Sequence, residues 1–235
     1  MEQTQNYMGT IGWIKGNLMS NPELADKNYN NENFVPGNPD IPNSHTPDKT
    51  MMQFTLEGSG TKIENNIASW NNSSSSVKGA LVVNNLPVLT DADNNFLFNS
   101  LEFQIKYGRV NSTDYSFKAF GFRTNSRFTN RTGYSVSSSS GGQQLQIYNK
   151  EGKNYLVDYK SFPLHSWYTL NFAYDNKAKK VKVIVQETLY NGTTSTVINV
   201  ERNEDLMLGN QLVLGNYSNK SSGTIDLNEC WFKLK

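Results

Sequence analysis

Hydrophobic and polar side chains alternate along most of the chain after residue 50. The clearest case is the segment 164–189, where every second residue of each half is apolar: Tyr168, Leu170, Phe172 and Tyr174, then Val181, Val183 and Val185. A period of two is typical of a β-strand with one buried face. The polar run 175–179 between the halves predicts a turn, and the whole segment therefore predicts a β-hairpin. One face of such a hairpin must be covered, so we expect it to belong to a larger antiparallel sheet.

The same alternation recurs in short segments separated by turn-forming residues. The expected strands are 51–57, 61–70, 79–83, 96–107, 115–122, 134–137, 144–148, 155–159, 194–200, 211–214 and 224–234. No window of helical periodicity lies between them. Many short strands without crossover helices predict an all-β fold, an antiparallel β-sandwich of the jelly-roll type, over residues 51–235.

Residues 1–50 differ from the rest and are predicted to form an extended arm for attachment or oligomerisation. Six of the seven prolines lie between Pro22 and Pro87, and four of them punctuate the run 33–50. Proline donates no backbone hydrogen bond and restricts the residue before it, so this run is extended or turn-like. An apolar cluster precedes it: Ile11, Trp13, Ile14, Leu18 and Met19. The cluster either folds back over its own domain or binds another chain.

Composition excludes several classes of function. The 22 basic and 21 acidic residues are scattered, which argues against binding nucleic acid or an anionic membrane. No signal-peptide pattern and no run of eighteen apolar residues occurs, so neither secretion nor membrane insertion is expected. A single cysteine, Cys230, and two histidines provide neither a disulfide nor a structural zinc site.

Catalytic patterns are missing, and we expect no catalytic residues and no enzyme activity. Glycosidases need two carboxylates facing one another, but the E-x-D-x-x-E pattern is absent, and Asp226 and Glu229 should face opposite sides of a strand. A Gly-x-Ser-x-Gly nucleophile turn is also absent.

One acidic segment is a candidate calcium site. Asp91, Asp93 and Asn95 place oxygen ligands at alternate positions, and Glu102 falls at the twelfth position of an EF-hand count. Phe96 occupies the position where such a loop needs glycine, so the complete motif is broken. The segment is either a single calcium site built from Asp91, Asp93 and Asn95 or a plain acidic turn.

Residues 51–235 resemble a known family. The runs 165–175 (HSWYTLNFAYD), 181–185 (VKVIV), 214–216 (LGN) and 222–230 (SGTIDLNEC) are similar to concanavalin A-like, laminin-G-like jelly rolls. In this fold we expect Trp167 and Ile225 to be core residues. The GTIDL ending and the detached arm further resemble domains of bacteriophage tail and capsid appendages.

That resemblance implies a non-enzymatic virion protein, such as a tail fibre or capsid decoration protein. It would be made in the host cytoplasm and joined to other virion subunits through the arm, as a homo-oligomer and by analogy a trimer. A host-surface glycan is the implied ligand, with Tyr134, Asn130, Arg131 and Tyr217 as candidate contacts, because sugars bind aromatic faces and amide or charged groups. Alternatives are a free-standing carbohydrate-binding lectin-like module and a glycoside hydrolase.

Overall fold

The computed structural model describes residues 49–72, 79–93, 95–108, 117–123, 132–136, 142–149, 152–161, 166–189, 191–215 and 221–235. The chain divides into two units, Met1–Asp48 and Lys49–Lys235, and every described residue belongs to the second. The predicted arm cluster and the candidate glycan contacts Asn130, Arg131 and Tyr217 lie outside the described residues, as does the side chain of Tyr134.

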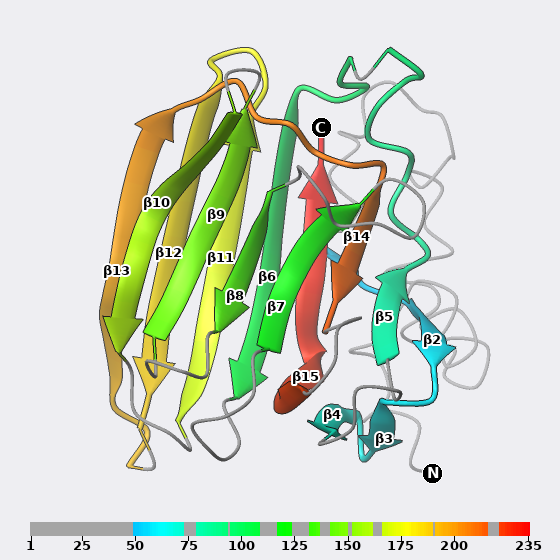
Figure 1. The fold of residues 1–235 in the computed structure, drawn as a ribbon, viewed down its shortest axis with the longest axis vertical. Coiled ribbons are helices and arrows are strands. Elements are labelled where there is room, and N and C mark those ends of the chain that lie inside the picture. Colours follow the sequence, from blue (N-terminus) through cyan, green and yellow to red (C-terminus); the bar gives the residue numbers. More distant parts are fainter. Residues whose placement is uncertain are drawn as a thin grey trace, which may run out of the picture. The chain divides into compact units, whose positions relative to one another are not determined.

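The described strands form two antiparallel sheets (Figure 1). The first sheet has the spatial order β13 (Thr194–Asn203), β12 (Lys180–Thr188), β11 (Trp167–Asp175), β6 (Ser100–Gly108), β15 (Ser221–Leu234), β4 (Ile67–Asn72) and β3 (Lys62–Glu64), with β1 (Thr50–Met51) beside β15. The second has the order β10 (Gly152–Ser161), β9 (Gly142–Asn149), β8 (Gly133–Val136), β7 (Phe117–Arg123), β14 (Gln211–Leu214), β5 (Gly79–Val83) and β2 (Phe54–Gly58). The predicted antiparallel sandwich is confirmed. Within the described ranges, no helix has the length and apolar character needed to cross a bilayer.

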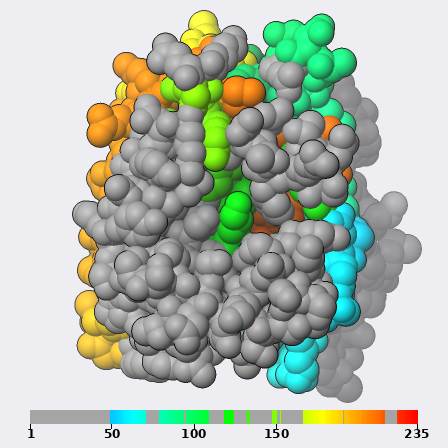
Figure 2. Space-filling model, viewed as in Figure 1, coloured from blue at the N-terminus to red at the C-terminus, as the bar shows by residue number. Residues whose placement is uncertain are grey.

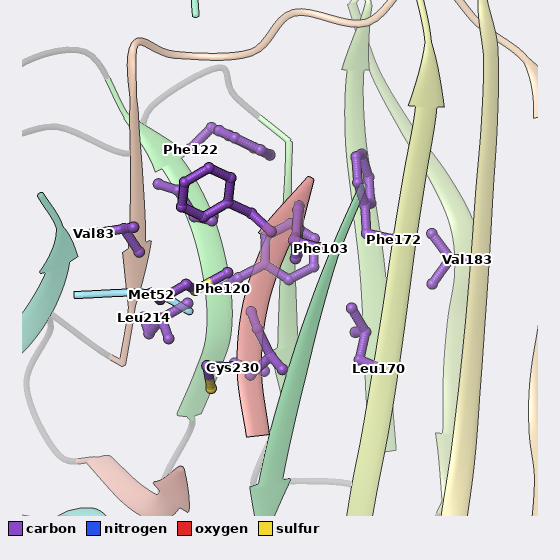
Figure 3. Packing of buried hydrophobic residues seen from close by; sticks show 14 of the residues in the cluster. Met52, Val83, Phe103, Phe120, Phe122, Leu170, Phe172, Val183, Leu214 and Cys230 are labelled. Atoms are coloured by element: carbon purple, nitrogen blue, oxygen red, sulfur yellow. The ribbon is translucent and has the colours of Figure 1, made fainter. Parts of the chain in front are cut away.

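The inner faces of the two sheets meet in one aromatic core. Residues of β11 alternate strictly between half-buried and buried, as predicted, and Phe172 pairs with Phe103 of β6. The Phe103 ring stacks on Phe172 at 4.8 Å between centroids and forms a T-shaped pair with Phe120 at 5.0 Å (Figure 3). Such aromatic pairs add specific geometry to the hydrophobic burial that holds the sheets together.

Trp167 is not a core residue, which corrects one expectation. The alternation that buries Tyr168 turns Trp167 to the outer face of the first sheet, where its side chain is half-buried and lies 5.7 Å from the Lys106 ammonium. Ile225, in contrast, is fully buried as expected.

Two strand boundaries also differ from the prediction. The segment 61–70 is not one strand, because Asn65 and Asn66 have φ values of 50° and 60° and form the turn of a β3–β4 hairpin. Paired positive φ values are what a two-residue hairpin turn requires, and asparagine tolerates them. The strand expected from residue 96 begins at Ser100, while Phe96 instead forms an isolated bridge with Thr90.

An irregular stretch in β15 corrects the prediction that Asp226 and Glu229 face opposite sides. Asp226 pairs with Lys106 and Trp231 pairs with Gln104, so five steps along β15 match two along β6. The extra residues bulge, and both carboxylates come near the Lys106 ammonium, at 3.4 Å and 3.8 Å. Within the bulge, the buried thiol of Cys230 donates to the Asp226 carbonyl oxygen at 3.2 Å.

A buried ion pair spans the outer face of the second sheet. Arg123 of β7 is 3% exposed, and its guanidinium donates to both carboxylate oxygens of Glu57 on β2, at 2.8 Å and 2.5 Å. Its Nε also donates to Gln211 at 3.0 Å. Because β14 and β5 lie between β7 and β2, the pair bridges both strands, whose outer faces carry a small apolar cluster: Ala80, Val82 and Val213.

Candidate functional site

A hollow of about 440 Å³ lies at one end of the sandwich, where three connections meet. These are the loop between β5 and β6, the turn between β11 and β12, and the connection from β13 to β14, which Figure 1 shows crossing that end of the sheets. In Figure 2 the blue-green atoms at the upper right belong to this part of the chain, at the same end of the molecule. The lining consists of Asp93, Asn95, Phe96, Asn176, Lys179, Asp205, Leu206, Met207 and Leu208.

The first connection is held in shape by Asp91. Its carboxylate accepts from the backbone N–H groups of Asp93 and Asn95 at 2.9 Å and 2.8 Å and from the Asn95 amide at 2.9 Å. The hydrogen bonds from the Asn95 side chain and backbone lower the pKa of Asp91, which is exposed. Asp91 therefore shapes the loop, while Asp93 and Asn95 line the hollow.

The second connection brings Lys179 and Asn176 to the hollow. Asn176 is fixed to the neighbouring loop, since its backbone N–H donates to Asn99 at 2.8 Å and its amide to the Phe98 carbonyl at 3.0 Å. The Lys179 ammonium donates to the Asn176 amide oxygen at 2.9 Å and lies 3.1 Å from the Asp205 carboxylate. This ion pair joins the second connection to the third.

The third connection, residues 204–208, is anchored through its backbone. Glu204 donates to the Lys179 carbonyl at 2.7 Å, and Met207 donates to the Tyr148 carbonyl at 2.6 Å. The Leu206 N–H donates to the Tyr174 hydroxyl at 3.4 Å. Burial raises the pKa of Tyr174 to about 12, so this hydroxyl stays protonated in the physiological range.

One aromatic ring, that of Phe96, lies among these polar groups. It packs against Phe98 and Tyr174 at centroid distances of 5.1 Å and 5.5 Å, which ties the hollow to the aromatic core. The Lys179 ammonium lies 5.6 Å from the Phe96 ring. The hollow thus combines carboxylates, amides and an ammonium with an aromatic surface. Such a set can accept and donate hydrogen bonds to hydroxyl groups and can contact C–H groups.

The structure places the three candidate calcium ligands on one loop, but it gives Asp91 other partners. Both Asp91 oxygens already accept hydrogen bonds from the loop, which is the arrangement of a polar turn. Among the described residues, no group of three or more histidine, cysteine, aspartate or glutamate side chains could hold a metal ion. Calcium binding stays a prediction.

Sequence reasoning found Asp93 and Asn95 but missed Phe96, Asn176, Lys179 and Asp205 as parts of a common site. The sequence of residues 175–179 predicts only a turn, and Asp205 follows a predicted strand without belonging to any recognisable motif. These residues meet because three connections end at the same edge of the sandwich, which local sequence does not reveal.

Comparison with known proteins establishes the fold. Arcelin-5, a lectin-like defence protein from Phaseolus vulgaris, is 13% identical, with a TM-score of 0.52 over 81% of this chain and 94% of its own. Lectin II from Ulex europaeus is 8% identical, with a TM-score of 0.52 over 80% and 96%. Peanut lectin, solved with a nine-residue peptide, is 13% identical, with a TM-score of 0.50 over 77% and 91%.

No protein-family model and no curated protein matches the chain. At these identities the structural similarity shows the fold alone: a legume-lectin-like sandwich, in agreement with the concanavalin A-like resemblance of the sequence.

Proposed function

We propose that this protein is a carbohydrate-binding, lectin-like module whose sugar site is the hollow at the end of the sandwich. The observation that carries the proposal is the lining itself, in which Asp93, Asn176 and Asp205 surround the Phe96 ring in about 440 Å³. That volume is within the usual range for small-ligand sites. The lectin-like fold supports the proposal by analogy only.

Binding without catalysis fits the surroundings of the two carboxylates. A glycosidase needs one carboxylic acid kept protonated, usually by apolar surroundings. Asp93 is exposed to solvent, and the Asp205 carboxylate forms an ion pair with the Lys179 ammonium at 3.1 Å, so neither lies in apolar surroundings. We therefore propose that both act as acceptors for sugar hydroxyls.

A bacteriophage virion protein, with an arm that binds other subunits and a trimeric assembly, stays a prediction from the sequence. The proposed sugar site is compatible with that prediction, since a host-surface glycan is the ligand that the virion resemblance implies.

Isothermal titration with monosaccharides tests the proposal. Asp93→Ala removes an exposed carboxylate whose side chain has no role in the loop hydrogen bonds above, so the fold should be preserved. We expect it to weaken sugar binding about tenfold or more, because a hydrogen bond to a charged group contributes about 1.5–3 kcal/mol. Glu64→Ala, which removes an exposed carboxylate on β3, is the matched control and should bind normally.

Two results would contradict the proposal. One is the absence of binding to any sugar tested. The other is equal binding by wild type and Asp93→Ala together with normal binding by Asp205→Asn, which would place the sugar elsewhere. Release of reducing sugars by the wild type would instead support the glycosidase alternative.

A further inference from the structure

The outer face of the first sheet carries a row of charged side chains that alternate in sign. Read across β15, β6, β11, β12 and β13, the paired residues of this row are Lys233, Glu102, Ala173, Lys182 and Glu201. Figure 1 shows these five strands side by side, with β11 in the middle. The charges run positive, negative, neutral, positive, negative. Each charge on one side of β11 therefore has the opposite charge at the same distance on the other side.

Such a row is complementary to itself when two copies of the sheet pack face to face. A two-fold axis along β11 places β6 of one copy against β12 of the other, and β15 against β13. Glu102 then faces Lys182 of the second copy, and Lys233 faces its Glu201. Both contacts occur twice, because a two-fold interface uses the same patch on each copy. Ala173 lies on the axis and faces its own copy.

The neighbouring rows add no repulsion under the same axis. The row beside it is uncharged and consists of Trp231, Gln104, Asn171, Ile184 and Asn199. In the next row Lys106 and Asp226 form an ion pair at 3.4 Å, and this pair faces uncharged residues of β12 and β13. At the end of β11, the Asp175 carboxylate accepts from the Ala178 N–H at 2.8 Å and is thus held within its own hairpin turn.

The face is accessible and large enough for a dimer contact. Lys182 and Glu201 are exposed, while Glu102, Ala173 and Lys233 are half-buried. A hollow of about 90 Å³ lies between Glu102 and Lys182, over the small side chain of Ala173, and gives room to the long side chains of a facing copy. The three middle strands are nine residues long. Five strands of this length cover about 700 Å². That area is close to the roughly 800 Å² that each partner contributes to a standard interface.

We propose that the outer face of the first sheet is the contact surface between two copies of this chain, which form a two-fold dimer with its axis along β11. The order of the charges carries the proposal, because opposite charges that face one another fix the register of an interface and exclude mismatched arrangements. Glu201 already pairs with Lys180 at 2.6 Å and lies 3.8 Å from Lys182. The second copy therefore extends an existing network and leaves no isolated charge buried.

The dimer has a consequence for sugar binding, and this consequence alone rests on the proposed function. An axis along β11 leaves the β11–β12 turns of both copies at the same end of the dimer. That turn contributes Asn176 and Lys179 to the hollow around Phe96, so both hollows lie at that end. Two sugar sites that face the same surface bind it with avidity.

The assembly mass of the full chain, measured by sedimentation equilibrium, tests the proposal. We expect the wild type to contain an even number of chains. Glu102→Lys and Lys182→Glu each place like charges face to face at both symmetry-related contacts. Each variant alone should raise the dissociation constant of the dimer about hundredfold or more, and should therefore halve the mass at a concentration where the wild type is fully associated.

Mixing the two variants provides a second readout. In a mixed pair the introduced lysine of one chain faces the introduced glutamate of the other, and the remaining contact is that of the wild type. The mixture should therefore regain the wild-type mass, which misfolded variants could not do. Glu64→Lys changes a carboxylate that is 65% exposed on β3, outside the row. It is the matched control and should keep the wild-type mass.

Three results would overturn the proposal. One is a wild type that contains an odd number of chains. Another is an even assembly whose mass both Glu102→Lys and Lys182→Glu leave unchanged, because that assembly uses a different surface. The third is dissociation of both variants without recovery on mixing, since the two positions then do not face one another. None of these results depends on sugar binding, so the dimer and the proposed function can fail independently.

Discussion

Removing Glu57, the ion-pair partner of Arg123, should destabilise the protein far more than removing the carboxylate of an equally short ion pair on the surface. Glu57→Ala leaves the Arg123 guanidinium, which is 3% exposed, without the carboxylate that accepts two of its hydrogen bonds. Breaking a buried ion pair costs about 3–5 kcal/mol. Glu57 is 35% exposed, so water can replace part of the interaction, and we expect a loss of about 2–3 kcal/mol in the free energy of unfolding.

The Lys62–Glu64 pair provides a matched control. Its 2.7 Å separation is similar, but its side chains are 71% and 65% exposed. Glu64→Ala should cost less than about 0.5 kcal/mol, since exposed pairs contribute little. Urea unfolding followed by tryptophan fluorescence measures both variants, and the double variant Glu57→Leu with Arg123→Met should recover most of the loss. Equal losses for Glu57→Ala and Glu64→Ala would refute the reasoning that burial decides the contribution.

The same pair predicts a dependence on pH. The hydrogen bonds from Arg123 lower the pKa of Glu57 below 4.5 in the folded protein. A lowered folded pKa means that the stabilisation is complete above the unfolded value and is lost as the pH falls through the folded value. The difference in stability between wild type and Glu57→Ala should therefore be constant near neutrality and shrink below pH 4.5. A difference that grows on acidification would contradict the assignment.

Three further predictions concern other parts of the sandwich. Phe103→Ala, at the centre of the aromatic core, should lower the free energy of unfolding by about 3–5 kcal/mol in urea titration, whereas a loss below about 1 kcal/mol would deny its central role. Gly215→Ala should lower the Tm, because Gly215 has a φ of +81° and a Cβ atom there would overlap the Trp70 ring; an unchanged Tm would show that neither matters. Millimolar calcium should leave the Tm unchanged by scanning calorimetry if the segment is a polar turn, since both Asp91 oxygens already accept hydrogen bonds, and a clear rise would instead support the predicted calcium site.

The alternation of side chains was sufficient to predict the architecture. Burying Tyr168, Leu170, Phe172 and Tyr174 on one face defines β11, and the same period defines β6 and β12. This period of two can be recognised in the sequence because successive residues of a strand point to opposite faces of the sheet.

Local irregularities were harder to predict. The Asn65–Asn66 dipeptide did carry a turn signal, since asparagine tolerates positive φ, but it lay inside an otherwise strand-like run. The bulge in β15 carried no such signal, because the register of Asp226 and Trp231 is set by their pairing with β6. The periodicity of a single strand contains no information about a register shift, because the shift arises from the pairing of that strand with its neighbour.

The candidate site was predicted only in part for a similar reason. Asp93 and Asn95 attracted notice through their spacing, but Asn176, Lys179 and Asp205 reach the hollow from connections more than 80 residues further along the chain. The buried state of Arg123 likewise depends on Glu57, which lies 66 residues away. These long-range contacts follow from the order of the strands in the sheets, which the sequence alone did not determine.

The burial of Cys230 has a practical consequence for chemical labelling of the protein. It is the sole thiol of the chain, it is buried, and burial raises its pKa to about 12, so the folded protein should not react with maleimides at neutral pH. A second cysteine introduced as Leu97→Cys, at a residue that is 60% exposed beside Phe96, can then carry a fluorophore with no need to delete the native thiol. The native cysteine should react only in molecules whose sheets have separated. The rate at which it is modified therefore measures how readily the sandwich opens.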